Sequence, residues 1–162
     1  MDRPDIAYAA KELCRDFAGP TQDSYLKLKR VVRYLAGRPR LVWKFDYQNT
    51  TQIIDVYVDT DFAGCFKTRR STSGGAAARG GHLLKTWSTT QTTVALSSAE
   101  AELTGLVKGA SQAIGSRSVA CDLGMQWEIC LHSDATAAIG ICKRKKPGQS
   151  SPPCHCRPVD TG

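Results

Sequence analysis

The strongest constraint on the fold is the order in which two kinds of hydrophobic periodicity follow one another along the chain. Short segments that alternate apolar and polar residues lie between residues 52 and 96, a long helical pattern runs from Ser97 to Gly124, and one further strand pattern follows at residues 128–133. Strands that precede a long crossover can pair antiparallel, whereas a strand that follows it returns parallel to an earlier strand. The order predicts an α/β (α+β) domain, in which a three-strand antiparallel meander and one parallel strand form a mixed sheet covered by helices.

Alternation and turn residues mark the individual strands. Residues 52–59 place Ile54, Val56 and Val58 on one face and polar residues on the other, as in a half-buried strand. Two more strands are predicted at residues 75–80 and 82–88, on either side of Gly80-Gly81. A short strand is also expected at residues 41–45, and residues 92–96 form either a third short strand or an extended lead-in to the long helix.

Four helices are expected from capping residues and from apolar residues at helical spacing. They cover about residues 4–17, 21–37, 97–124 and 135–144, with Thr21 and Ser97 as N-terminal caps and Gly37 at a C-terminal cap. In the long helix the predicted apolar stripe consists of Leu103, Leu106, Val107, Ala110, Ala113, Ile114, Arg117, Ala120 and Cys121.

Composition is compatible with one ordinary globular domain of 162 residues, with 41% hydrophobic and 23% charged residues. No apolar run approaches the roughly 20 residues that span a bilayer, and no secretory leader is recognisable, so we expect a cytosolic or nuclear protein without membrane contact. Most of the seven cysteines are expected to be reduced thiols. The net charge of +7 comes from grouped Lys and Arg residues, which indicate either nucleic-acid binding or solvated faces.

Three acidic residues, far apart in sequence, occupy positions from which they can converge. Asp59 and Asp134 are predicted at the ends of two strands, and Glu102 in the early turns of the long helix. If the two strands are adjacent, these carboxylates would repel one another unless a cation joined them, and Mg2+ prefers such oxygen ligands. The alternative is that Asp134 caps the following helix and Glu102 complements a helix dipole.

A set of short motifs follows in order along the chain: Tyr57-Val58-Asp59-Thr60-Asp61-Phe62-Ala63-Gly64, Arg70-Ser71-Thr72-Ser73-Gly74-Gly75, Thr86-Trp87-Ser88, Val94-Ala95-Leu96-Ser97-Ser98-Ala99-Glu100-Ala101-Glu102-Leu103, Ser133-Asp134-Ala135 and Ala138-Ile139. This ordered set resembles the ribonuclease H domain of copia-type retrotransposon polyproteins. Residues 3–7 and 28–37 resemble the segment that joins reverse transcriptase to ribonuclease H in the same polyproteins.

The resemblance implies a ribonuclease H-like fold and hydrolysis of the RNA strand of an RNA–DNA hybrid at two Mg2+ ions, with Mn2+ as a possible substitute. It implies that Asp59 bridges both metals and that Glu102 and Asp134 complete their ligand shells. Asp61 and Glu100 are the nearest alternatives for the first two positions. Residues expected to contact the hybrid are Lys67, Arg69, Arg70, Ser97 and Ser98.

The resemblance divides the chain into residues 1–46, a helical connection to reverse transcriptase, and residues 47–144, the ribonuclease H-like domain. Residues 145–162 depart from the family pattern and are expected to be a disordered, aberrant tail, produced by truncation or a frameshift. Prolines in this tail argue against a central strand there. We therefore expect the strand ending at Asp134 to have an unprotected edge, and a fourth ligand to be absent, with His155 and Asp160 as the only substitutes.

Three functions remain open at this point. The first is a Mg2+-dependent nuclease, impaired by the missing ligand. The second is a catalytically inactive transposon remnant that binds nucleic acid non-specifically. The third is a connecting piece that packs against the reverse transcriptase domain of the same polyprotein.

Overall fold

The computed structural model describes residues 3–49, 51–144 and 154–158. The chain separates into two compact units, residues 1–45 and residues 46–162. Each unit is described by itself.

The first unit is a pair of helices. A 3-10 turn, Pro4–Ile6, leads into α1, Ala7–Arg15, and α2 spans Gln22–Gly37. Thr21 caps α2 as predicted, because its hydroxyl accepts a hydrogen bond from the Ser24 amide at 3.3 Å. The predicted cap at Gly37 is wrong by one position, since Gly37 is the last helical residue and Arg38 follows as the C-cap.

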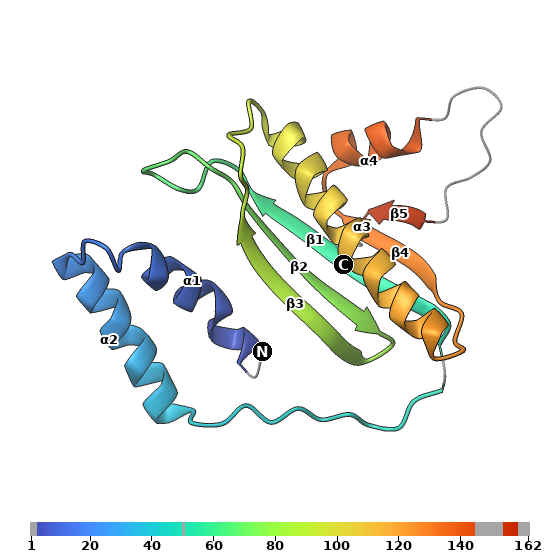
Figure 1. Ribbon diagram of the computed structural model, residues 1–162, viewed down its shortest axis with the longest axis horizontal. Coiled ribbons are helices and arrows are strands. Elements are labelled where there is room, and N and C mark those ends of the chain that lie inside the picture. The colour runs from blue at the N-terminus through green and yellow to red at the C-terminus, as the bar shows by residue number, and fades with distance from the viewer. Residues whose placement is uncertain (1–2, 50, 145–153, 159–162) are drawn as a thin grey trace. The chain divides into compact units, whose positions relative to one another are not determined.

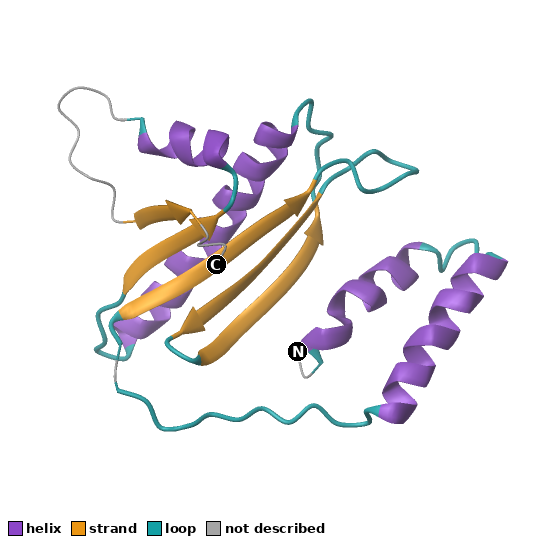
Figure 2. Cartoon of the chain, turned by 180° about the vertical axis from the view of Figure 1, so that it is seen from behind, coloured by secondary structure: helices purple, strands orange, loops and turns teal. Residues whose placement is uncertain are grey.

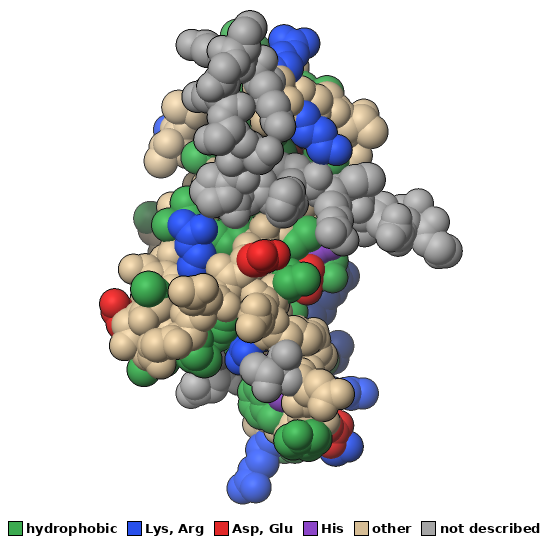
Figure 3. Space-filling model, turned by 90° about the vertical axis from the view of Figure 1, so that its right-hand side faces the viewer, with side chains coloured by type: hydrophobic (Ala, Val, Ile, Leu, Met, Phe, Trp, Pro, Cys, Tyr) green, Lys and Arg blue, Asp and Glu red, His purple; other side chains and the backbone are tan. Residues whose placement is uncertain are grey.

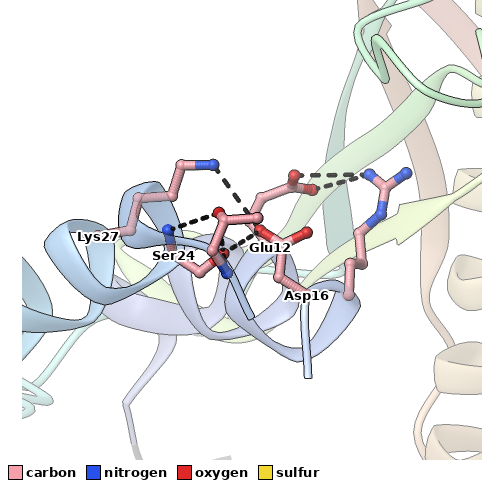
Figure 4. Close-up of polar contacts among 6 residues, drawn as sticks. Glu12, Asp16, Ser24 and Lys27 are labelled. Carbon is pink, nitrogen blue, oxygen red and sulfur yellow. Dashed lines mark hydrogen bonds and ion pairs between the residues drawn. The ribbon is translucent and has the colours of Figure 1, made fainter. Parts of the chain in front are cut away.

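Polar contacts hold α1 and α2 together (Figure 4). The Ser24 hydroxyl donates a hydrogen bond to Asp16 Oδ2 at 3.0 Å, and Lys27 Nζ lies 4.0 Å from the same oxygen. Arg15 forms an ion pair with Glu12 at 3.2 Å on α1 itself. Asp16 makes these contacts at the turn between the helices, and at their far ends the Tyr34 hydroxyl donates a hydrogen bond to Asp5 Oδ2 at 2.8 Å, so the helix pair is tied at both ends.

The strand predicted at residues 41–45 is not formed. These residues have no regular secondary structure, and Val42 is 83% exposed. Trp43 and Phe45 stack on each other with ring centroids 6.4 Å apart instead of packing on a sheet. The apolar pattern is present in the sequence, but without a partner strand it does not become β-structure.

The second unit contains a mixed sheet in the order β3-β2-β1-β4-β5 (Figure 1). Its first three strands, β1 (Ile53–Asp61), β2 (Thr72–Arg79) and β3 (His82–Thr90), form the predicted antiparallel meander. The next strand, β4 (Glu128–Ser133), pairs parallel with β1. The predicted mixed α/β class is therefore confirmed.

One long helix, α3 (Ser98–Asp122), crosses one face of this sheet, and the opposite view shows the strands in front of it (Figure 2). The face of α3 that meets the sheet consists mainly of small residues: Ala101, Gly105, Gly109, Ala113 and Ala120 are buried, together with the larger Leu106. The predicted stripe is only partly correct, because Val107 and Ile114 are exposed. The core beneath α3 is formed by Ile54, Val56, Val58, Ala77, Leu106, Ala113, Ile129, Leu131 and Ala138.

The end of the chain corrects two expectations. A short helix, α4 (Thr136–Lys143), follows β4, and residues 154–158 form a strand, β5 (Cys154–Pro158), parallel to β4. The edge of β4 is therefore covered, and five residues of the segment predicted to be disordered are a strand. The argument that prolines exclude a central strand is not contradicted, because β5 lies at the sheet edge, where a missing amide donor is tolerated. The remaining residues of the predicted tail lie outside the described residues.

Within the part of the chain that the structure describes, no helix is both long enough and apolar enough to cross a membrane.

Candidate metal centre

Three carboxylates from three different elements meet beside the sheet. Asp59 comes from β1, Glu102 from the second turn of α3, and Asp134 from the residue that follows β4. One oxygen from each lies within 4.8 Å of the others. The convergence predicted from the sequence is therefore present, while the role of these residues as metal ligands stays a prediction.

Strand pairing explains why the two aspartates come together. The chain enters β1 and β4 from the same side, since the two strands are parallel and adjacent in the sheet. Asp59 was predicted at the end of its strand, and this is wrong by two positions, because Thr60 and Asp61 continue to pair with β2. Asp134 stands one residue beyond Ser133, the end of β4.

Asp134 does not serve as the cap of α4. The N-cap of α4 is Ala135, and no side chain makes a capping hydrogen bond there. The Ala135 amide instead donates to the Ser133 hydroxyl at 3.2 Å. The capping explanation for an aspartate at this position therefore loses its support.

Glu102 is brought to the aspartates by the close approach of α3 to β1. A Cβ atom added at Gly105 would lie 2.3 Å from Thr60 Oγ1, and one added at Gly109 would lie 2.4 Å from Val58 Cγ2. Larger residues at these two positions would push the helix away from the strand. The two glycines thus set the distance between the helix-borne carboxylate and the strand.

The structure also separates the carboxylates in the cluster from their sequence neighbours. Glu100 Oε2 accepts a hydrogen bond from the Leu96 amide at 2.8 Å, and the Glu100 amide donates to Ser97 Oγ at 3.2 Å, so Glu100 helps to begin α3. Asp61 lies against Gly64, where a Cβ would come within 1.7 Å of its carboxylate. Neither belongs to the group of three, which favours the preferred assignments of Asp59 and Glu102.

Among the three carboxylates, Glu102 has a clearly raised pKa. Partial burial, and the nearby carboxylates of Asp134 and then Asp59, raise the pKa of Glu102 to about 7. The nearby Thr60 hydroxyl lowers the pKa of Glu102, but only in part, because it is not within ordinary hydrogen-bond geometry. A proton or a cation is therefore favoured at this position near neutral pH.

The residues present fit a divalent cation. Glu102 Oε2 is a buried oxygen without a hydrogen-bond partner, which a metal ion would satisfy. The ligand set consists of oxygen atoms alone, the type that Mg2+ and Mn2+ accept. Asp59 and Asp134 are exposed, so the cluster is open to solvent on one side, as a site that also accepts a substrate must be.

The predicted nucleic-acid contacts lie in two places. Lys67, Arg69 and Arg70 are exposed in the loop between β1 and β2, which is tied by the bond from the Arg69 amide to the Cys65 carbonyl at 2.7 Å. Ser97 and Ser98 begin α3, where Ser97 is engaged as the cap. Figure 3 shows one side of the molecule, on which Lys and Arg side chains reach the surface at several separate places.

Sequence reasoning missed a positioning role for Gln91. This buried side chain donates hydrogen bonds to Ser73 Oγ and to the Ala101 carbonyl, both at 2.9 Å, and so ties β2 to the first turn of α3. The glutamine stands in a polar run of threonines, and nothing in that run distinguishes it from an exposed residue. Only the return of the helix over the sheet makes it internal.

The fold and the carboxylate cluster define a mixed α/β domain with a candidate site for divalent cations. No protein-family model matches the chain. It is 36% identical over 124 residues to "Retrovirus-related Pol polyprotein from transposon RE2" of Arabidopsis thaliana, a match that covers 76% of this chain and 8% of the polyprotein. It is also 34% identical over 112 residues to "Uncharacterized mitochondrial protein AtMg00810" of the same plant, with 69% of this chain and 46% of that protein covered.

A third relative is "Secreted RxLR effector protein 161" of Plasmopara viticola, 36% identical over 114 residues, with 70% of this chain and 80% of that protein covered. The chain is a homologue of retrotransposon Pol polyproteins. It spans less than half of the mitochondrial relative and about a tenth or less of the polyproteins. The similarity to Pol polyproteins fits a place within a multi-domain polyprotein.

Proposed function

We propose that this chain is a ribonuclease H-type segment of a retrotransposon Pol polyprotein, which cleaves the RNA strand of an RNA–DNA hybrid with divalent cations. The observation that carries the proposal is the group of three carboxylates, Asp59, Glu102 and Asp134, whose oxygens lie within 4.8 Å of one another. Homology to Pol polyproteins supports it independently. The mixed sheet with a long crossover helix is compatible with a ribonuclease H-like fold.

Two Mg2+ ions held by such a cluster would activate water and stabilise the departing oxygen of a phosphodiester. The part played by the chain is to hold the three carboxylates in place before any ligand arrives. β1 and β4 fix the two aspartates through their parallel ladder, and Gly105 and Gly109 fix the approach of Glu102. Burial, and then the charges of Asp134 and Asp59, raise the pKa of Glu102, so a cation that offsets these effects is favoured at the cluster.

The proposal is tested by cleavage of a labelled RNA–DNA hybrid in Mg2+. Asp59→Asn removes one charge from the cluster and is expected to lower the rate on the order of a hundredfold, because a metal site supplies several kcal/mol to such a reaction. The matched control is Asp61→Asn, two residues along the same strand and outside the cluster, which should retain most of the activity. Equal rates for the two variants would contradict the assignment.

The basic loop supports a second candidate, a catalytically inactive remnant that binds nucleic acid without cleaving it. Lys67, Arg69 and Arg70 are exposed on one loop and would contact phosphates of any sequence. In this case binding falls steeply with salt, does not distinguish hybrid from duplex DNA, and is unchanged by Asp59→Asn. The proposed nuclease instead requires hybrid cleavage that depends on Mg2+ and on Asp59.

Cleavage is expected to be weaker than in a domain with a fourth ligand. Asp160 lies outside the described residues, and the structure gives only the backbone position of His155, in β5. Comparing His155→Ala with the unchanged chain at several Mg2+ concentrations tests whether this residue contributes. A higher Mg2+ requirement in the variant would assign it a role, and unchanged activity would exclude one.

The partner proposed for the first unit is a reverse transcriptase domain of the same polyprotein. Between α1 and α2 lies an apolar cavity of about 300 Å3, lined among others by Leu13, Phe17, Tyr25 and Leu28. Phe17 and Tyr25 are also largely exposed, so this surface can accept an apolar side chain. Leu28→Glu is expected to abolish binding to a purified reverse transcriptase fragment while leaving hybrid cleavage unchanged.

A further inference from the structure

A second group of metal-binding side chains lies on the same two strands, apart from the carboxylate cluster. Asp55 is on β1, and Cys130 and His132 are on β4. Parallel pairing places Asp55 beside Cys130 and Tyr57 beside His132. The residues that alternate with them, Ile54, Val56, Ile129 and Leu131, belong to the core under α3, so the group occupies the face of the sheet opposite the helix.

The three side chains converge. His132 Nε2 lies 2.8 Å from Asp55 Oδ1, and one ligand atom from each of Asp55, Cys130 and His132 lies within 4.8 Å of the others. The ring of Tyr57 stacks on the imidazole with centroids 4.6 Å apart and an interplanar angle of 15°, which fixes the plane of the histidine. Cys130 is buried and carries a thiol rather than a disulfide.

We propose that Asp55, Cys130 and His132 form a site for a borderline-soft divalent transition-metal ion, with Zn2+ as the representative occupant. One sulfur, one imidazole nitrogen and one carboxylate oxygen make a ligand set typical of Zn2+ and poorly suited to Mg2+. Zinc bonds of about 2.0–2.3 Å require ligand atoms some 3–4 Å apart. The Asp55–His132 pair, at 2.8 Å, would separate slightly, and any pair of ligand atoms near the 4.8 Å limit would draw together by about 1 Å. Among the residues whose side chains the structure describes, three ligands leave a fourth position for water or another group.

The contrast with the carboxylate cluster gives the site its specificity. The oxygen cluster of Asp59, Glu102 and Asp134 selects hard cations, whereas the group containing Cys130 selects softer ones. Two neighbouring strands hold Asp55, Cys130 and His132, so binding requires no rearrangement of a loop. The competing explanation is that His132 and Asp55 form only a hydrogen-bonded pair that stabilises the sheet.

Cobalt distinguishes these explanations, because a Co2+–thiolate bond gives a charge-transfer absorption that a hydrogen-bonded pair cannot give. The full chain, reduced and freed of metal, is titrated with Co2+ and then with Zn2+ in excess Mg2+. One equivalent of Co2+ should produce the thiolate band, and Zn2+ should displace it. Cys130→Ser should abolish the band, and His132→Ala should weaken Co2+ binding by at least about tenfold.

Three matched variants control for other ligands. Cys142→Ser, at an exposed cysteine of α4, and Asp59→Asn, in the carboxylate cluster, should both leave the band unchanged. A double variant, Cys154→Ser with Cys156→Ser, tests the other end of the chain. The proposal is overturned if no band forms at stoichiometric Co2+, or if the band survives Cys130→Ser and disappears in the double variant.

Folding of each variant is checked by circular dichroism. Should Cys130→Ser fail to fold, Asp55→Asn keeps the size of the side chain and removes only the charged ligand. Folded Asp55→Asn with unchanged Co2+ affinity would also overturn the proposal. Because Asp59→Asn lowers the proposed nuclease activity and leaves this site intact, failure of one proposal is distinguishable from failure of the other.

Discussion

The helix α3 and the helix α2 show how differently two amphipathic sequences can be used. In α2 large apolar residues such as Tyr25, Leu28 and Val32 are substantially exposed, whereas α3 buries mainly alanine and glycine. The sheet unit therefore uses small residues where the helix meets the strands and leaves larger ones, such as Val107, outside. In α3 small size indicates the packed face better than hydrophobicity does, with Leu106 as the exception.

The largest test of this contrast compares two neighbouring residues of α3. Leu106 is 2% exposed in the core, and Val107 is 64% exposed. Leu106→Ala should lower the free energy of unfolding by about 2–5 kcal/mol, because it leaves a cavity. Val107→Ala should change it by less than about 0.5 kcal/mol. Urea denaturation of both variants measures the difference, and similar losses would show that the packed face is wrongly assigned.

A second test concerns the small residues themselves. Gly109→Ala is expected to destabilise the chain by about 1–3 kcal/mol, because the added methyl group would overlap Val58. Gly115→Ala, on the same helix with nothing within 4 Å, should instead stabilise it by up to about 1 kcal/mol through helix propensity. Thermal melting of the two variants measures their stability. A stabilising Gly109→Ala would contradict the close packing of α3 on β1.

The third test uses the raised pKa of Glu102, which is about 7 when folded against an ordinary 4.5. Above pH 7 the folded chain must keep a charged carboxylate where charge is disfavoured. As the pH falls from 7 towards 4.5, the folded state takes up a proton that the unfolded state does not, and stability rises. Glu102→Gln should therefore stabilise the metal-free chain at pH 8 by roughly 1 kcal/mol, reduced from the full shift by solvent screening, and have little effect at pH 4.5.

Melting curves at the two pH values, with and without Mg2+, measure this effect. Mg2+ should stabilise the unchanged chain at pH 8 and not the Glu102→Gln variant, because the cation removes the same penalty. Glu100→Gln is the control, since its carboxylate accepts from the Leu96 amide, and it should be slightly destabilising at pH 8. A destabilising Glu102→Gln at pH 8 would contradict the electrostatic account.

The smallest effect is expected in α2. Val32→Gln replaces a side chain that is 55% exposed, so the free energy of unfolding should change by less than about 0.5 kcal/mol. Chemical denaturation of the full chain measures it. A loss comparable to that of Leu106→Ala would mean that α2 is buried in solution against a partner or another copy.

The features that could be predicted from the sequence are those determined by local patterns of residues. The meander and the bounds of β4 follow from alternation, from Gly80 and from the crossover, and Gly80 indeed has a positive φ of 57°. Convergence of Asp59, Glu102 and Asp134 follows from the same topology.

Other features depend on neighbouring strands and helices that are distant in sequence, which a local sequence pattern does not identify. The apolar residues 41–45 lack a neighbouring strand, and β5 exists because β4 offers it an edge. Which face of α3 is buried depends on how closely the sheet approaches, which hydrophobic periodicity does not encode. The group of Asp55, Cys130 and His132 requires the register of β1 against β4, which becomes visible only after the strands are paired.

The position of β1 and β4 inside the sheet has a kinetic consequence. Each of these strands has a hydrogen-bonded neighbour on both sides, so its amides are protected by a ladder whichever side they point to. Both groups of candidate ligands draw members from these strands. We therefore expect their amides to be among the slowest to exchange with deuterium, and the ligand geometry to persist until the sheet unit as a whole unfolds.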